Sequence, residues 1–205
     1  MFEGKNPPLV PGRECGGCDV CCVHLTIDEP ALRKPFGLRC HNLLPSMNRC
    51  AIYESRPQTC RGFFCGWRML KWVKPGLRPD ISGVLITLTY HDKAGEMLHA
   101  KDFDKIASTG ISFSLLRQDA VESEGLAESV AAAVGSGTQV HIRIPGPPGP
   151  TRAVIRVDRV LKPAVLARDK AAVVHWLRKA WDMGSTAKSE EIELYGPGFA
   201  PNGPD

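Results

Sequence analysis

The sequence Cys15-Gly-Gly-Cys18-Asp-Val-Cys21-Cys22 places four thiols within eight residues. A C-x-x-C turn brings two sulfurs to the same side of a tight loop, and this stretch overlaps two such turns. Gly16 and Gly17 let backbone amides turn toward the sulfurs, where they can hydrogen-bond to thiolates and tune their electronic properties. The pattern predicts a tetrathiolate metal site or the first ligands of a 4Fe-4S cluster.

Four further cysteines follow at wider spacing, and no cysteine occurs after residue 65. They are Cys40, Cys50, Cys60 and Cys65. Two four-coordinate sites would use all eight sulfurs, but one cluster with one mononuclear ion, or one site with redox-active thiols, fits the count equally well. Adjacent Cys21 and Cys22 point in different directions, so they either serve two sites or leave one thiol packed as a non-ligand. All eight cysteines are candidate metal ligands.

The composition is that of an ordinary globular protein of 205 residues, of which 43% are hydrophobic and 23% charged. One or two small domains are expected. The N-terminus has no apolar run suited to a secretory signal, and no stretch approaches the roughly 20 apolar residues of a membrane helix. We therefore expect a soluble, cytoplasmic protein with no membrane partner. In a reducing compartment, dense cysteine indicates metal or redox chemistry instead of disulfides.

Basic residues are concentrated in the cysteine-rich part of the chain. Residues 1–79 hold 12 basic and 6 acidic groups, a net charge of +6, whereas residues 80–205 hold 14 and 16, a net charge of −2. The positive excess fits partial neutralisation of metal-bound thiolates better than nucleic-acid binding, since no block of five or more lysines and arginines occurs. We expect no nucleic-acid partner.

The cysteine spacing also carries a family resemblance. The C-x-x-C-x-x-C-C signature at residues 15–22 resembles that of bacterial cysteine-cluster proteins described as zinc- or iron-chelating domains, a family that includes flagellin lysine N-methylase. The later stretch Cys50-Ala-Ile-Tyr-Glu-Ser-Arg-Pro-Gln-Thr-Cys60-Arg61 is similar to the family's C-x-I-Y-x-x-R-P-x-x-C-R pattern. The match covers about residues 12–66 and implies zinc or iron bound by the cysteines, with Cys65 beyond the part of the pattern that matches.

Several side chains near the cysteines are candidates for a supporting role. Arg56, Arg61 and Arg68 could hydrogen-bond to thiolates or neutralise them, and a solvated surface charge is the alternative for each. His24 and His41 lie near cysteines in the sequence and could replace one as a ligand. The other histidines are dispersed without metal-ligand spacing, so we expect them at the surface or in packing.

The chain after residue 79 has the alternating, β-branched pattern of half-buried strands. Ser82–Tyr90 is predicted to be a strand, and Glu96–Lys101 is predicted to be its hairpin partner. Val140–Ile144 and Ala153–Val160 are predicted to form a second hairpin.

Two helices are predicted in the same part of the chain, over Ala120–Val134 and over Pro163–Trp181, where Pro163 suits a first turn. A further short helix is predicted around Pro30–Arg33. We expect a fold of α+β class, in which a small irregular cysteine-rich, metal-bound module packs with an antiparallel sheet and two helices. The expected boundaries are residues 1–79 for the module, 80–183 for the α+β segment and 184–205 for an irregular tail.

The sequence has no motif that assigns a reaction. No Ser-His-Asp order, phosphate loop or paired-carboxylate spacing occurs, and no strand precedes a Gly-rich turn of the kind that binds S-adenosylmethionine. The sequence therefore predicts a metal-binding protein that chelates iron, as an iron-sulfur cluster, or zinc. One alternative is a cluster-dependent oxidoreductase or protein-modifying enzyme related to flagellin N-methylase, and another is a zinc-stabilised module that binds a protein partner.

Overall fold

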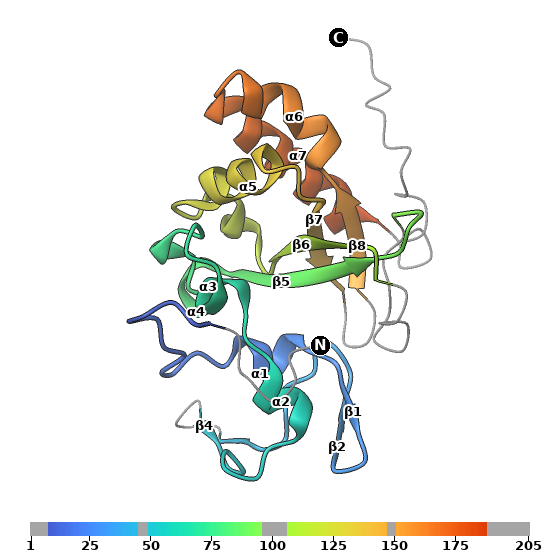
Figure 1. Cartoon of the computed structure of the whole chain (residues 1–205). Coiled ribbons are helices and arrows are strands. Elements are labelled where there is room, and N and C mark those ends of the chain that lie inside the picture. The colour runs from blue at the N-terminus through green and yellow to red at the C-terminus, as the bar shows by residue number, and fades with distance from the viewer. Residues whose placement is uncertain (1–7, 45–48, 96–105, 147–150, 188–205) are drawn as a thin grey trace.

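A computed structural model describes residues 8–44, 49–95, 106–146 and 151–187 of the chain. Figure 1 shows a central sheet with helices above it and the cysteine-rich segments below it. We call residues 15–65 the cysteine region and residues 84–187 the sheet region. Helices and strands are both present, so the α+β class is confirmed.

The sheet has four strands in the order β5-β6-β7-β8. Their bounds are β5 Val84–His91, β6 Ser108–Leu115, β7 Val140–Pro145 and β8 Thr151–Arg156. A single row of paired residues crosses all four strands, and its side chains are at most 1% exposed. These residues are Ile86, Phe113, Ile142 and Ile155. The alternation that predicts strands thus places one apolar face of the sheet in the core.

Helices cover this apolar face. They are the 3-10 helix η3 Gln118–Glu122, α5 Leu126–Gly135, α6 Asp158–Leu166 and α7 Lys170–Thr186. Leu126, Leu161 and Leu177 are fully buried between the helices and the sheet. α5 carries the chain from β6 back to the start of β7, which lets these two strands pair in parallel.

The predicted antiparallel sheet is therefore wrong in one pairing. β5 pairs antiparallel with β6, and β7 pairs antiparallel with β8, but β6 and β7 are parallel because a helical crossover joins them. The predicted hairpin between residues 140–144 and 153–160 is confirmed as the pairing of β7 with β8, but its second strand ends at Arg156 and residues 158–160 belong to α6. The predicted partner Glu96–Lys101 lies outside the described residues, and the strand that pairs with β5 is β6.

The two predicted helices are each divided. The prediction over residues 163–181 is wrong at its start and middle, because α6 begins at Asp158, includes Pro163 in its interior and ends at Leu166. Arg168 then has a φ of +55°, and Asp169 caps α7 by accepting a hydrogen bond from the Ala172 N–H at 2.9 Å. The prediction over residues 120–134 becomes η3 and α5, separated by the left-handed Gly125.

The cysteine region contains only short elements. They are α1 Val20–His24, β1 Ile27–Glu29, β2 Leu32–Lys34, β3 Leu43–Leu44, β4 Arg49–Cys50 and α2 Gln58–Gly62. The short helix predicted around residues 30–33 is wrong, because Ile27 and Leu32 face a common core and the chain forms the β1–β2 hairpin instead. The connecting segment to the sheet holds α3 Gly66–Met69, the 3-10 helix η1 Pro75–Leu77 and α4 Pro79–Ser82.

The described helices differ from membrane-spanning helices. None of them combines sufficient length with sufficient apolar character to cross a bilayer.

Candidate metal centre

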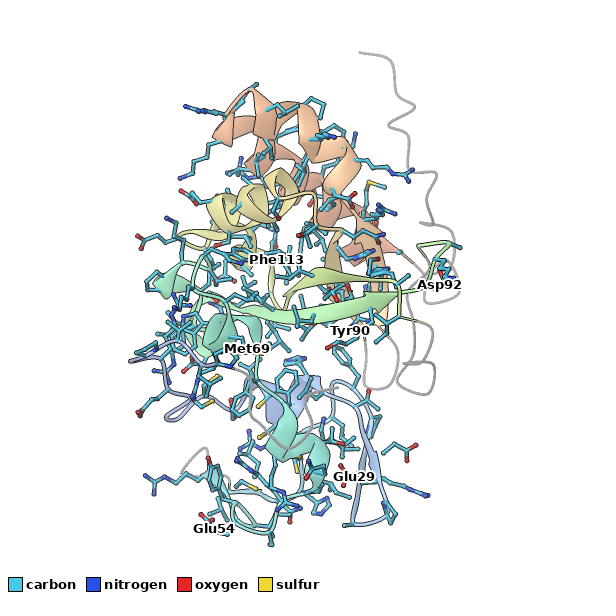
Figure 2. All side chains as sticks on the ribbon, in the orientation of Figure 1. Glu29, Glu54, Met69, Tyr90, Asp92 and Phe113 are labelled. Carbon is cyan, nitrogen blue, oxygen red and sulfur yellow. The ribbon has the colours of Figure 1, made fainter. Side chains whose placement is uncertain are left out.

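The short elements of the cysteine region bring together cysteines that are far apart in the sequence. α1 carries Cys21 and Cys22, α2 carries Cys60, and Cys65 immediately precedes α3. Figure 2 shows sulfur atoms gathered in the lower part of the molecule, beneath the sheet. All eight cysteines lie within the described residues and are free thiols.

The N-terminal segment lies across the connecting segment that leads to the sheet. The Val10 N–H donates to the Arg68 carbonyl at 2.8 Å. The Arg13 guanidinium donates to the carbonyls of Trp67 and Val73, each at 2.7 Å, and its carbon atom lies 5.6 Å from the centre of the Trp67 ring. These contacts fix the position of residues 10–13 and hence of the first cysteines.

This crossing places Cys15 and Cys18 beside the connecting segment. Arg68 Nη1 lies 3.5 Å from Cys15 Sγ, and Arg78 Nη2 donates to the Cys15 carbonyl at 3.0 Å. Asp80 approaches Cys18 from the same segment. We call Cys15, Cys18, Cys21 and Cys65 the inner set, because it lies next to the sheet region.

Burial controls the acidity of two inner thiols. It raises the pKa of Cys18 to about 11, while the backbone N–H groups of Val20 and Asp80 oppose the rise. Burial also raises the pKa of Cys65, and the N–H groups of Arg68 and Trp67 oppose that rise. Both sulfurs therefore face backbone donors that favour a thiolate, yet the thiols hold their protons near neutral pH until a cation offsets the cost of burial.

Cys21 and Cys22 interact directly. A hydrogen bond between the two side chains raises the pKa of Cys21 and lowers that of Cys22. The other sulfurs that raise the pKa of Cys21 are those of Cys15 and Cys18. Cys22 instead faces the charged groups of Asp19, Lys34 and Arg39.

The remaining thiols surround a small apolar core. Cys40 is buried with Ile27, Leu32 and Leu43, and Cys22 and Cys60 pack against this cluster. The Cys40 N–H donates to the Cys22 carbonyl at 3.0 Å. Cys50 enters through the β3–β4 pairing, where it lies opposite Leu43. We call Cys22, Cys40, Cys50 and Cys60 the outer set.

The helix that carries Cys60 is fixed by a carboxylate. Glu29 on β1 accepts hydrogen bonds from the N–H groups of Thr59, at 2.6 Å, and Gln58, at 3.2 Å, at the beginning of α2. A hydrogen bond from the Thr59 side chain, together with these backbone bonds, lowers the pKa of Glu29. Burial raises the pKa of Cys60, and the neighbouring thiols of Cys22, Cys40 and Cys50 raise it further. Four sulfurs from distant parts of the sequence are thus electrostatic neighbours.

A buried ammonium lies beside the outer set. Lys34 is only 3% exposed, and its Nζ donates to the carbonyls of Val23 and Leu38 at 2.8 Å and Pro35 at 3.1 Å. Burial lowers the pKa of Lys34, and the adjacent thiols, led by Cys40, oppose that change. This arrangement keeps a positive charge next to sulfurs that would carry negative charge when bound to a metal.

The residues predicted to support the thiols differ in what they contact. Arg68 does contact a thiol, whereas the Arg56 guanidinium lies 3.9 Å above the Tyr53 ring. Arg61 acts on Glu29, lowering the pKa of that carboxyl. Gly16 has a φ of +53°, which allows the turn closed by the 2.9 Å hydrogen bond from the Cys18 N–H to the Cys15 carbonyl.

For the other residues predicted to support or replace the thiols, the contacts given are not with a cysteine sulfur. Nothing lies within 4 Å of a Cβ built on Gly17, so that residue is in an open position. His24 packs edge-on against Phe36, with 5.7 Å between ring centres, and burial lowers its pKa. His41 shares a 3.1 Å hydrogen bond with Asn42.

Four functional residues were missed at the sequence level. They are Arg13, Glu29, Lys34 and Arg78, which position the cysteine-bearing segments or place charge beside the sulfurs. Their roles depend on carbonyls and amides brought together by the fold, and no motif in the sequence marks them. The N–H groups beside Cys65, and that of Val20 beside Cys18, belong to residues that follow each cysteine closely, a signal that the local C-x-x geometry could have provided. The Asp80 N–H beside Cys18 comes from a distant segment and has no such local signal.

The donor set suits zinc and iron, but the thiols do not form a ready-made cage. Within the described ranges, no three His, Cys, Asp or Glu side chains are arranged to hold a metal ion. Soft thiolates match both metals, and metal sites commonly complete their geometry only on binding. The residues therefore fit in their chemistry, and binding would draw neighbouring sulfurs together.

Comparison of the chain with protein-family models, with curated proteins and with solved structures found no significant match. The resemblance to the cysteine-cluster family therefore rests on the residues quoted above and stays a prediction.

Proposed function

We propose that this chain binds zinc or iron through its eight cysteines, with iron held as an iron-sulfur cluster of the 4Fe-4S type. The convergence of eight free thiols in a region with only a small apolar core carries this proposal. A segment of this size buries too little apolar surface to hold its fold, and metal–ligand bonds commonly replace the missing core.

The surroundings of the thiols support the proposal. Backbone N–H groups face Cys18 and Cys65, the Arg68 guanidinium contacts Cys15, and the Lys34 ammonium lies beside the outer set. Such groups stabilise thiolates and would offset the negative charge of a sulfur-ligated centre. A bound iron-sulfur cluster would supply electron transfer, whereas zinc would supply a rigid cross-link.

We favour a structural or electron-transfer role over catalysis, because eight sulfurs can fully coordinate two four-coordinate centres without leaving a position open for a substrate. A cavity of about 540 Å³ is lined by residues of η3 and α7, including Trp181 and Asp182, and none of its lining residues is a cysteine. An enzyme acting through a cysteine-bound cofactor needs a substrate pocket beside that cofactor. This cavity gives no support to the cluster-dependent enzyme, which we keep as a secondary proposal together with the zinc-stabilised interaction module.

Anaerobic purification followed by elemental analysis and a visible spectrum tests the proposal. We expect stoichiometric zinc or iron, with visible charge-transfer absorption if iron-sulfur clusters are present and a colourless protein if zinc is bound. A colourless protein with no stoichiometric zinc or iron would contradict the proposal.

A further inference from the structure

The eight thiols gather in two places, each fixed by its own backbone contacts. The inner set lies where the N-terminal segment crosses the connecting segment, and the outer set lies around the small core of the cysteine region. We infer that the inner and outer sets form two separate four-sulfur metal centres. This inference rests on the proposed function and adds to it the ligands of each centre.

Packing separates the two sets. Cys65 packs against the large core of the sheet region, whereas Cys22 and Cys60 pack against the separate cluster that contains Cys40 and Leu43. Because the two clusters share no buried residue, Cys65 of the inner set and three cysteines of the outer set pack against different bodies of apolar side chains. A metal bound by either set would therefore connect that body to its own ligand loops.

Hydrogen bonds separate them in the same way. The Val10–Arg68, Arg68–Cys15 and Arg78–Cys15 contacts join only the segments that carry inner cysteines. The Cys22–Cys40 bond and the Glu29 bonds to the first turn of α2 join segments that carry outer cysteines. Each set thus has contacts of its own, while α1 and the 3.5 Å contact between Arg39 and Asp19 link the two sets.

The division passes between the adjacent residues Cys21 and Cys22. Successive side chains on a helix point about 100° apart, so α1 can direct one thiol to each set. Besides Cys22, the thiols of Cys15 and Cys18 act on Cys21, while the Cys22 carbonyl accepts a hydrogen bond from the Cys40 N–H at 3.0 Å. The two centres would thus meet at α1.

The most exposed and the most buried of the eight thiols belong to different sets. Cys15 of the inner set is exposed, whereas Cys40 of the outer set is buried and has the buried Lys34 ammonium nearby. We expect a competing chelator to remove metal from the inner centre first, since an exposed ligand can be displaced from solvent.

The adjacent pair provides a matched test: Cys21→Ser and Cys22→Ser change neighbouring residues of one helix by the same atom. The metal content of each anaerobically purified variant is measured by native mass spectrometry. The variant is then alkylated with iodoacetamide, and the labelled cysteines are mapped. We expect Cys21→Ser to keep one of two metal centres and to expose its three inner partners to alkylation. We expect Cys22→Ser to keep the other centre and to expose its three outer partners.

Two further variants and one experiment on the unaltered chain guard against misfolding. Cys65→Ser should reproduce the labelling of Cys21→Ser, and Cys60→Ser that of Cys22→Ser. In the wild-type protein, increasing chelator concentrations should make the inner four thiols reactive to iodoacetamide before the outer four.

The outcomes distinguish the inference from the proposed function. A wild-type protein that binds no metal and is alkylated at all eight thiols would overturn both. A metal-loaded wild type whose Cys21→Ser and Cys22→Ser variants each lose all metal, or expose the same cysteines, would overturn the separate centres and indicate one joined cluster. If all eight thiols become reactive at the same chelator concentration, the inference of two separate centres is overturned too.

Discussion

The sheet region and the cysteine region are held together by different kinds of contact. In the sheet region, a continuous row from Ile86 to Ile155 is buried across all four strands and covered by three α-helices. In the cysteine region, the corresponding core consists of a few residues, and one of them is itself a cysteine. The sheet region can therefore be stable through apolar burial alone, whereas we expect the cysteine region to depend on cross-links.

Ion pairs occur in both regions, as between Arg33 and Asp28 in the cysteine region, but the cations nearest the thiols have other partners. In the sheet region, charged side chains pair with each other, as in the two hydrogen bonds from Arg156 to Asp158 at 2.9 and 3.1 Å. In and beside the cysteine region, Arg13 and Lys34 bond to backbone carbonyls, and Arg68 contacts a sulfur. The local excess of positive charge thus positions loops and faces thiols, as the sequence composition suggests.

The largest effect is expected from a substitution in the core of the sheet region, which tests whether the two regions are independent. Phe113→Ala removes a fully buried ring from the centre of the sheet and should lower the free energy of unfolding by about 3–5 kcal/mol. Urea unfolding followed by far-ultraviolet circular dichroism measures the change, and the metal content per chain should stay constant while the sheet region unfolds. A loss of metal equal to the loss of folded protein at mild temperature would show that the regions are not independent.

Acid should act on the sheet region through His141. Burial, reinforced by the stacked His91 ring 5.2 Å away and by Arg156, lowers the pKa of His141 to about 4. Because the unfolded chain binds this proton more tightly, stability is complete above the unfolded pKa of about 6.5 and falls as the pH drops toward 4.

The matched variant is His141→Gln, which keeps a polar side chain but cannot titrate in this range. The difference in unfolding free energy between wild type and variant should change by up to about 3 kcal/mol between pH 7 and pH 4. Denaturant titrations at several pH values measure it. Parallel pH profiles for the two proteins would show that His141 does not contribute.

A smaller effect is expected where the connecting segment meets the sheet. A Cβ on Gly66 of α3 would collide with the Ile86 side chain of β5, so Gly66→Ala should cost about 1–3 kcal/mol through overpacking. Gly17→Ala is the control, because nothing lies within 4 Å of its Cβ position. Thermal unfolding compares the two, and equal melting temperatures would contradict the close contact between α3 and β5.

The subtlest expected effect concerns the buried ammonium. Lys34→Met removes the positive charge beside the outer set and should weaken metal retention there by about 10- to 100-fold. Lys71→Met removes an exposed lysine and serves as the control. Competition with a chromophoric chelator measures both, and equal retention in the two variants would exclude an electrostatic role for Lys34.

The fold was predictable where local pattern and tertiary contact agree. The alternation in β5 and in the β7–β8 hairpin predicts those strands, because each places its apolar residues on the core side. The same alternation occurs in β6 at Ile111 and Phe113, yet its parallel partner is set by the α5 crossover and not by local sequence. Likewise, residues 30–33 form a hairpin because Ile27 and Leu32 share a core, a contact that the short sequence pattern does not specify.

The candidate site was predictable in its ligands and not in its arrangement. The C-x-x-C spacing marks the cysteines, because thiols at that spacing converge locally. Their assignment to two sets depends on where the loops around Cys40, Cys50 and Cys60 return, which is decided by β-pairing and by the Glu29 contact to α2. Lys34 is similarly invisible in the sequence, since its position depends on three carbonyls that meet only in the folded chain.

Hydrogen–deuterium exchange before and after metal removal tests the contrast between the two regions most directly. The anaerobically purified protein is labelled with and without a chelator, and protection is mapped by peptide mass spectrometry. We predict that amides in residues 15–65 lose protection when metal is removed, while the amides of β5–β8 keep theirs. Unchanged protection of residues 15–65, or a simultaneous loss in both regions, would contradict the account.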